Sequence, residues 1–205
     1  MIRHDERVAR VISAIDAANA SDPRMVGIDG RQEPVELVYG RRITETMLRM
    51  VVEPSVHLRI AVRGQHIERW KIPRASYPEG RAGYHSWRRR QRDHQARRLG
   101  EIMAEAGYEP DAIARVGTLI RKENMKGDAE VQTLEDIICV TFLQYYLPDF
   151  STKVDTDKLA GILAKTWRRM SVHGHEHALR LDLRPEVHRL LQRGLHELET
   201  KAGGA

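Results

Sequence analysis

Residues 34–70 read PVELVYGRRITETMLRMVVEPSVHLRIAVRGQHIERW and carry the clearest helical pattern in the chain. Apolar residues recur there at intervals of three and four, which predicts two amphipathic helices. Pro34 suits the first turn of the first helix, because proline has no N–H to donate and its φ is already helical. Ser55 is a suitable N-cap for the second helix. We expect that helix to end before Pro73, since the residue preceding a proline avoids the α region.

The same periodicity extends outward from this stretch and predicts an all-α fold. Further helices are expected over residues 6–20, 86–106, 110–123, 131–147, 157–171 and 184–199. Loops are expected over 21–33 and 72–84, where Pro and Gly occur without a period. The only strand-like stretch is LRLDL at 179–183. We therefore expect a single helical domain over residues 1–180, followed by a C-terminal helix and a short flexible tail over residues 181–205.

The composition indicates a cytoplasmic protein with no membrane partner. The 205 residues include one cysteine, Cys139, which excludes a disulfide scaffold and suits a reducing compartment. The first ten residues are strongly charged and no apolar segment follows them, so we expect no secretory signal. The longest apolar stretch, 137–147, is too short to span a bilayer.

Positive charge is concentrated in residues 59–98. The whole chain has 34 Lys plus Arg and 29 Asp plus Glu, whereas this block has twelve Lys or Arg and three acids. It also holds four of the eleven aromatic residues, namely Trp70, Tyr77, Tyr84 and Trp87. Arginine binds phosphate through a bidentate fork, and aromatic rings stack on bases or on guanidinium groups. The block therefore predicts an anionic partner, unless its arginines pair with carboxylates and its aromatic rings only fill the fold.

Several residues in and beside this block are candidates for binding an anionic small molecule, a nucleotide or a nucleic acid. In a continuous helix over 56–70, Arg63, His66 and Trp70 would share one face and form an anion-binding strip. The alternative is that the arginines on this face are simply solvated. The expected ligand-binding residues are Arg42, Arg63, Arg69, Trp70, Arg74, Tyr77, Tyr84, Arg88 and Lys122.

Two adjacent acids, Glu135 and Asp136, interrupt the most apolar predicted helix. A buried carboxylate needs a cation, a metal ion or a proton. With His66, an arginine or Lys122 as partner, the result is either a structural ion pair, which is the commoner outcome, or a metal or catalytic site. His66, Glu135 and Asp136 are therefore the candidate catalytic residues. The tract HGHEH at 173–177 is a weaker metal-binding candidate, and we expect it to be a solvated loop.

The segments RRITETMLRM, LRIAVRGQHIERW and VGTLIRKENMKGDAEVQTLEDIICVTFL together resemble the HD superfamily of metal-dependent phosphohydrolases. This resemblance implies a helical bundle, a divalent metal ion (Mn, Mg or Fe) and hydrolysis of a phosphoester or phosphoanhydride. It places His66 as the histidine of the family's His-Asp pair and Asp136 as its late aspartate.

The chain departs from the HD pattern at two of the metal ligands. Ile67 stands where the paired aspartate belongs, and Tyr39 or Arg41 stands where the first histidine belongs. Glu68 and His94 are the candidate replacements. The resemblance thus leaves two of the family's metal ligands, His66 and Asp136, with His94 as the third expected ligand. The two retained ligands alone would hold a catalytic metal poorly.

The motifs ELVYGRRI, QHIERW, IPRASYPEG, GYHSW, LEDIICVTFL and KTWRRMS resemble an uncharacterised family, domain of unknown function 4202. This resemblance covers roughly residues 10–180, implies a single domain and supplies no reaction. We therefore expect an HD-like helical protein that binds a phosphorylated small molecule or nucleotide, with phosphoester hydrolysis as its reaction if it is an enzyme. The alternative is a non-enzymatic nucleic-acid-binding module that uses the block at 59–98.

Overall fold

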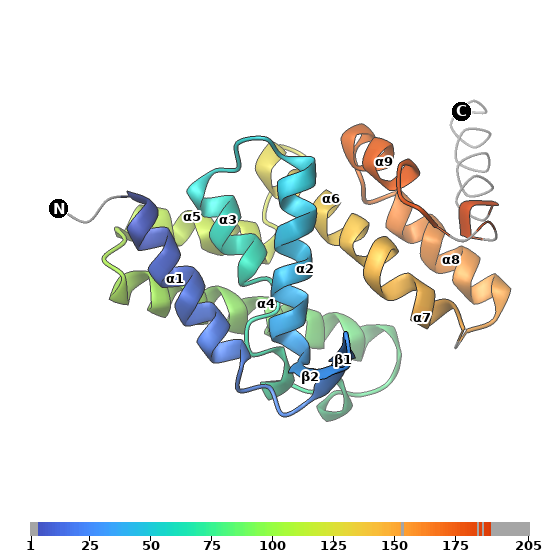
Figure 1. The fold of residues 1–205 in the computed structure, drawn as a ribbon, viewed down its shortest axis with the longest axis horizontal. Helices are drawn as coiled ribbons and strands as arrows, with labels where there is room; N and C mark the ends of the chain where they lie inside the picture. Colours follow the sequence, from blue (N-terminus) through green and yellow to red (C-terminus); the bar gives the residue numbers. More distant parts are fainter. Residues whose placement is uncertain (1–3, 153, 184, 186, 190–205) are drawn as a thin grey trace. The chain divides into compact units, whose positions relative to one another are not determined.

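The fold consists almost entirely of helices, as expected, in a computed structural model that describes residues 4–152, 154–183, 185 and 187–189 (Figure 1). The chain divides into two compact units, Met1–Val131 and Gln132–Ala205. In the part of the chain that the structure describes, no helix combines the length and apolar character needed to cross a membrane.

The first unit carries most of the helices and a short β-hairpin. Its elements are α1 (His4–Asn19), β1 (Met25–Ile28), β2 (Arg31–Pro34), α2 (Val35–Met50), α3 (Val56–Arg63), the 3₁₀ turns η1 (Arg69–Lys71) and η2 (Arg74–Ser76), α4 (Gly80–Glu105), α5 (Pro110–Arg121) and the start of α6 (Ala129–Thr141). Helix α3 packs against α1, α2 and α5, and α4 packs against α1 and α5. The core side chains between these helices are fully or almost fully buried and include Val11, Ile15, Ile43, Met47, Ile60, Leu99, Met103, Leu119 and Ile120.

The second unit continues α6 through a π-helical stretch, η3 (Phe142–Tyr146), into α7 (Leu147–Ser151). Helices α8 (Thr156–Trp167) and α9 (Val172–Leu179) follow. We expected the apolar helix to stop at Pro148, but this residue lies in the first turn of α7, where proline's missing N–H is tolerated. The predicted helix at 184–199 and the tail lie largely outside the described residues. The predicted division of the chain at residue 180 stays a prediction.

Three predictions of local structure were wrong. Residues 21–33, expected to be a loop, contain the β1–β2 hairpin, which lies beside the start of α2 (Figure 1). Asp29 and Gly30 form its turn with φ of 48° and 79°, the positive values that a tight two-residue hairpin requires. The expected strand at 179–183 is absent, because Leu179 ends α9 and residues 180–183 are irregular. The HGHEH tract is likewise part of α9 rather than a loop.

The predicted helix over 56–70 is also interrupted. Helix α3 ends at Arg63, and a turn over 64–68 precedes η1. A Cβ atom at Gly64 would lie 2.4 Å from Cδ2 of Leu99, so a larger residue there would force the Leu99 side chain or the end of α3 to move. As a result, Arg63, His66 and Trp70 do not share one helical face. Tyr84, which we expected in a loop, lies in α4 because that helix begins at Gly80.

The predicted N-cap of α3 is confirmed and can be tested. The Ser55 hydroxyl accepts the N–H of Leu58 at 3.0 Å. Replacement of Ser55 by Ala is therefore expected to lower the free energy of unfolding by about 1 kcal/mol in urea titrations. The Ser55→Asn variant keeps a capping oxygen and adds no second carboxylate beside Glu130, which the Ser55 hydroxyl contacts, so it should remain within about 0.5 kcal/mol of the native protein. Equal losses in both variants would show that the cap does not stabilise α3.

Candidate functional site

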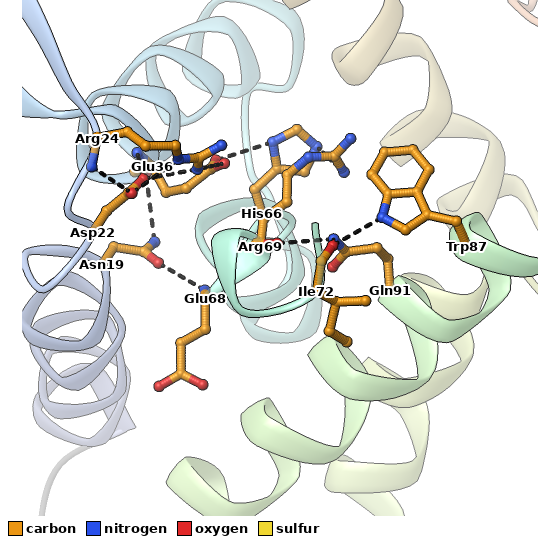
Figure 2. A network of polar contacts seen from close by, with 10 residues as sticks. All are labelled: Asn19, Asp22, Arg24, Glu36, His66, Glu68, Arg69, Ile72, Trp87 and Gln91. Carbon is orange, nitrogen blue, oxygen red and sulfur yellow. Dashed lines mark hydrogen bonds and ion pairs between the residues drawn. The ribbon is translucent and has the colours of Figure 1, made fainter. Parts of the chain in front are cut away.

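A buried polar network joins the start of α2 to the turn that follows α3 (Figure 2). Its centre is Glu36, whose side chain is 4% exposed. One carboxylate oxygen of Glu36 lies 3.2 Å from Nδ1 of His66, and the other accepts a hydrogen bond from Arg24 at 2.7 Å. Burial disfavours the charge on Glu36, but the hydrogen bonds from His66 and Arg24 outweigh this effect and hold the pKa of Glu36 below its usual range.

Asp22 caps α2 from a position before the hairpin. Its Oδ2 accepts the backbone N–H of Glu36 at 3.2 Å, and Pro34, the N-cap residue, offers no side-chain hydrogen bond of its own. Arg24 donates to both oxygens of the buried Asp22 carboxylate at 3.0 Å and 2.8 Å. A carboxylate at the start of a helix also interacts favourably with the helix dipole. The short segment that leads from α1 into the hairpin therefore supplies the charged groups that hold Glu36 in place.

Asn19, at the end of α1, connects Glu36 to the turn after α3. Its amide donates to the carbonyl oxygen of Glu36 at 3.5 Å, and its Oδ1 accepts the N–H of Glu68 at 3.0 Å. Glu68 has a left-handed φ of 51°. In Figure 2 its side chain points away from His66 and Glu36. The Glu68 side chain instead lies 2.9 Å from Nζ of Lys71 and 3.5 Å from Nε of Arg98.

Helix α4 fixes the 3₁₀ turn η1 through its own side chains. The amide of Gln91 donates to the carbonyl oxygens of Arg69 and Ile72, both at 2.9 Å, and the indole N–H of Trp87 donates to Ile72 at 2.9 Å (Figure 2). Gln91 and Trp87 are both buried. The position of the Arg69 backbone is therefore set by two side chains of one rigid helix.

His66 is held between an aromatic ring and two charged groups. It stacks on Tyr39 with a ring-centroid distance of 3.8 Å, and its Nε2 lies 3.4 Å from a guanidinium nitrogen of Arg69. Burial and the positive charge of Arg69 lower the pKa of His66 to about 4, although Glu36 opposes this shift. Because Glu36 also pairs with Arg24, its negative charge stabilises a protonated His66 less than an unshared carboxylate would. At neutral pH the ring is therefore neutral, with Nδ1–H donated to Glu36 and Nε2 accepting from Arg69.

Two guanidinium groups beside His66 lack a carboxylate partner. Arg69 lies over the ring of Trp87 at 4.6 Å and forms no ion pair with any described residue. Burial lowers the pKa of Arg69, Glu36 opposes this, and the charge of Arg88 lowers it further. Arg88 is half-buried and, among the described residues, has neither a hydrogen-bond nor an ion-pair partner. The two cations thus repel each other, and neither has a carboxylate partner among the described residues.

The structure brings together only part of the predicted ligand-binding set. His66, Arg69, Arg88 and Tyr84 interact electrostatically, and Tyr84 lies 5.8 Å from the Trp87 ring. The remaining predicted residues make other contacts in the first unit. Arg63 pairs with Asp16 at 2.6 Å, and Arg74 donates to the Tyr77 carbonyl at 2.8 Å. Arg42 in α2 and Trp70 in η1 are half-buried, and Lys122 is the C-cap residue of α5.

Glu135 and Asp136 belong to local structure of the second unit. Asp136 accepts the backbone N–H of Ser171 at 2.8 Å, beside the start of α9, and also accepts from Gln132 at 2.9 Å. Glu135 lies 3.2 Å from Nε of Arg169. Glu135 thus forms a structural ion pair, with Arg169 in place of the expected His66, arginine of 56–70 or Lys122, and Asp136 accepts hydrogen bonds beside the start of α9.

The candidate metal ligands do not form a three-ligand cluster. His94 lies 3.5 Å from Glu68, whereas His66 contacts Glu36 and Arg69. Within the described residues, no three His, Cys, Asp or Glu side chains are grouped so that they could hold a metal ion. As arranged, these residues do not fit the divalent metal that the HD resemblance implies.

Reasoning from the sequence missed the residues that organise the site. Glu36, Asp22, Arg24 and Gln91 were not predicted, and Tyr39 was considered only as the residue in place of a histidine. The sequence signal for Glu36 is weak: it is an acid in the first turn of a helix, which is common for solvent-exposed residues. Nothing in the local pattern shows that it pairs with a histidine thirty positions later.

Fold and site together define a helical protein with a buried Glu–His pair beside two arginines that have no carboxylate partner among the described residues. The chain belongs to the family described as domain of unknown function (DUF4202), whose family model matches residues 9–191. The family predicted from the sequence motifs is thus confirmed. Neither the curated proteins nor the solved structures include a match to this chain.

Proposed function

We propose that this protein binds a phosphorylated small molecule or nucleotide at Arg69 and Arg88, beside His66. The supporting observation is that these two guanidinium groups are partly buried and lack a carboxylate partner among the described residues. By contrast, Arg24 and Arg63 are fully paired with acids. A phosphate group would supply the missing negative charge through charge-assisted hydrogen bonds.

Aromatic side chains provide a surface for the organic part of such a ligand. Tyr84 is 44% exposed and lies next to the Trp87 ring, on the same helix as Arg88. Rings in this arrangement can stack on a base or pack on a sugar. The proposed site therefore combines a cationic end, formed by Arg69 and Arg88, with an aromatic end.

The proposed reaction, phosphoester hydrolysis, depends on His66. In the unliganded site its pKa of about 4 makes it a weak base. A bound phosphate next to Arg69 would raise this pKa, because a nearby negative charge favours the imidazolium. His66 would then be able to accept or donate a proton at Nε2. The proposed location is the cytoplasm, since a single cysteine suits a reducing compartment.

Binding can be tested by isothermal titration calorimetry with inorganic phosphate and AMP. Arg69→Gln and Arg88→Gln are each expected to weaken binding about tenfold or more, because each removes a charge-assisted hydrogen bond. Arg89→Gln is the matched control, since Arg89 is exposed on the same helix. No binding to the native protein, or an equal loss in the control, would refute the proposed site.

Hydrolysis is tested separately by phosphate release from a panel of nucleotides and phosphoesters, with and without Mn²⁺, Mg²⁺ or Fe²⁺. We expect release from at least one substrate and its loss in His66→Gln. Absence of release under every condition would reduce the function to binding alone.

A further inference from the structure

A second cationic site lies in a groove between α4 and α5. The groove has a volume of about 740 Å³, within the range of ligand-binding pockets. Arg90, His94 and Arg97 line it from α4, and Gly117 and Arg121 line it from α5. No residue of the proposed phosphate site contributes to this lining.

Positive charge in the groove exceeds negative charge by two. The lining holds three arginines and one acid, Asp93, which lies 3.4 Å from Nε of Arg121. Arg90 has no hydrogen bond or ion pair with any residue that the structure describes. Arg97 lies 3.3 Å from Nδ1 of His94 and only within 4.0 Å of Glu101. Two guanidinium groups on one wall are thus available to an anion.

Gly117 allows Arg121 to lie along the groove wall. A Cβ atom at Gly117 would be 2.8 Å from a guanidinium nitrogen of Arg121, so any larger residue would displace that side chain. Arg121 therefore lies against its own helix, with its Nε 3.4 Å from Asp93 of α4. This arrangement places cations on both walls.

The groove is separate from the site at Arg69 and Arg88. On a helix with about 100° per residue, Arg90 and Arg97 lie on one face, two turns apart, whereas Arg88 lies about 200° from Arg90. The two sites thus use opposite faces of α4. A polymer in the groove would not need to contact Arg88.

We propose that this groove binds a single nucleic-acid strand through its phosphodiester backbone. Cations on two walls suit a chain of phosphates, and arginine forks bind phosphate well. The ten lining residues include no Phe, Trp or Tyr, so binding is independent of base sequence. The apolar part of the lining consists of small groups and Ile113, which gives no deep pocket for the bulky anchor residues of a peptide.

The test is fluorescence anisotropy of a labelled oligouridine of about 12 nucleotides across a salt series. The triple variant Arg90→Gln/Arg97→Gln/Arg121→Gln is expected to bind about tenfold more weakly. Its plot of log affinity against log salt should be shallower by about 2, since each lost contact with a single strand removes about 0.7. Circular dichroism would verify that the variant is folded.

A second triple variant, which removes the same number of positive charges, distinguishes binding in the groove from nonspecific electrostatic attraction. Arg10→Gln/Arg31→Gln/Arg168→Gln removes the same charge from exposed positions outside the groove and should lose less than about twofold. Equal losses in the two triple variants would overturn the proposal, as would stronger binding of duplex RNA or equal competition by polyglutamate. Retained phosphate binding by the groove variant would show that the two sites are independent.

Discussion

Replacement of Glu36 by Ala is expected to lower the free energy of unfolding by about 3 kcal/mol, as measured by urea titration at pH 7. The change removes the acceptor for the N–H of His66 and one of the two carboxylates that pair with Arg24. The imidazole would then be left in a mostly buried position without its partner, and the loss of a buried partner costs more than the pair itself contributes. Arg24 is 47% exposed, so water can solvate its charge and the loss of its ion pair contributes little to the destabilisation.

Two further variants show whether this effect comes from the buried charge. Glu33→Ala removes a nearby glutamate whose partner, Arg41, is about half exposed, and should cost less than about 0.5 kcal/mol. Glu36→Gln keeps an oxygen that accepts from His66 and should lose about half as much stability as Glu36→Ala. If Glu36→Ala proves as mild as Glu33→Ala, the network does not stabilise the fold.

Helical periodicity was enough to predict the fold class because most helices bury one face. The Ser55 cap could also be predicted, because serine is a preferred residue type at the N-cap position of a helix. The hairpin was missed although its Asp29–Gly30 turn is a recognised signal, because its strands are short and mostly exposed and so show no clear alternation.

The candidate site was only partly predictable. His66, Arg69 and Arg88 attracted attention through residue type and charge density. Glu36 did not, since its role depends on α1, the hairpin and α3 meeting at one point. The predicted strip on a continuous helix was wrong for a tertiary reason: Gly64 lies against Leu99, and the chain turns there. Such contacts between elements leave no periodic trace in the sequence.

Acidification from pH 7 to pH 5 is expected to remove about 2 kcal/mol of stability through His66 alone. In the folded protein, burial and the charge of Arg69 lower the pKa of His66 to about 4. In the unfolded chain a histidine has a pKa of about 6.5. Between these values the unfolded chain binds a proton that the folded protein does not, so stability falls as the pH falls. Asp22, Glu36 and Asp128 have lowered pKa values and add to the loss only below about pH 4.5.

The contribution of His66 is isolated by comparing variants between these two pH values. His66→Gln keeps an N–H for Glu36 but cannot titrate, so its stability should fall by about 2 kcal/mol less than that of the native protein. Burial also lowers the pKa of His94, which acts in the same direction, so His94→Gln is measured in parallel. If His66→Gln loses as much stability as the native protein, then His66 is not held neutral by its surroundings, and the charge excess at Arg69 and Arg88 must be compensated in another way.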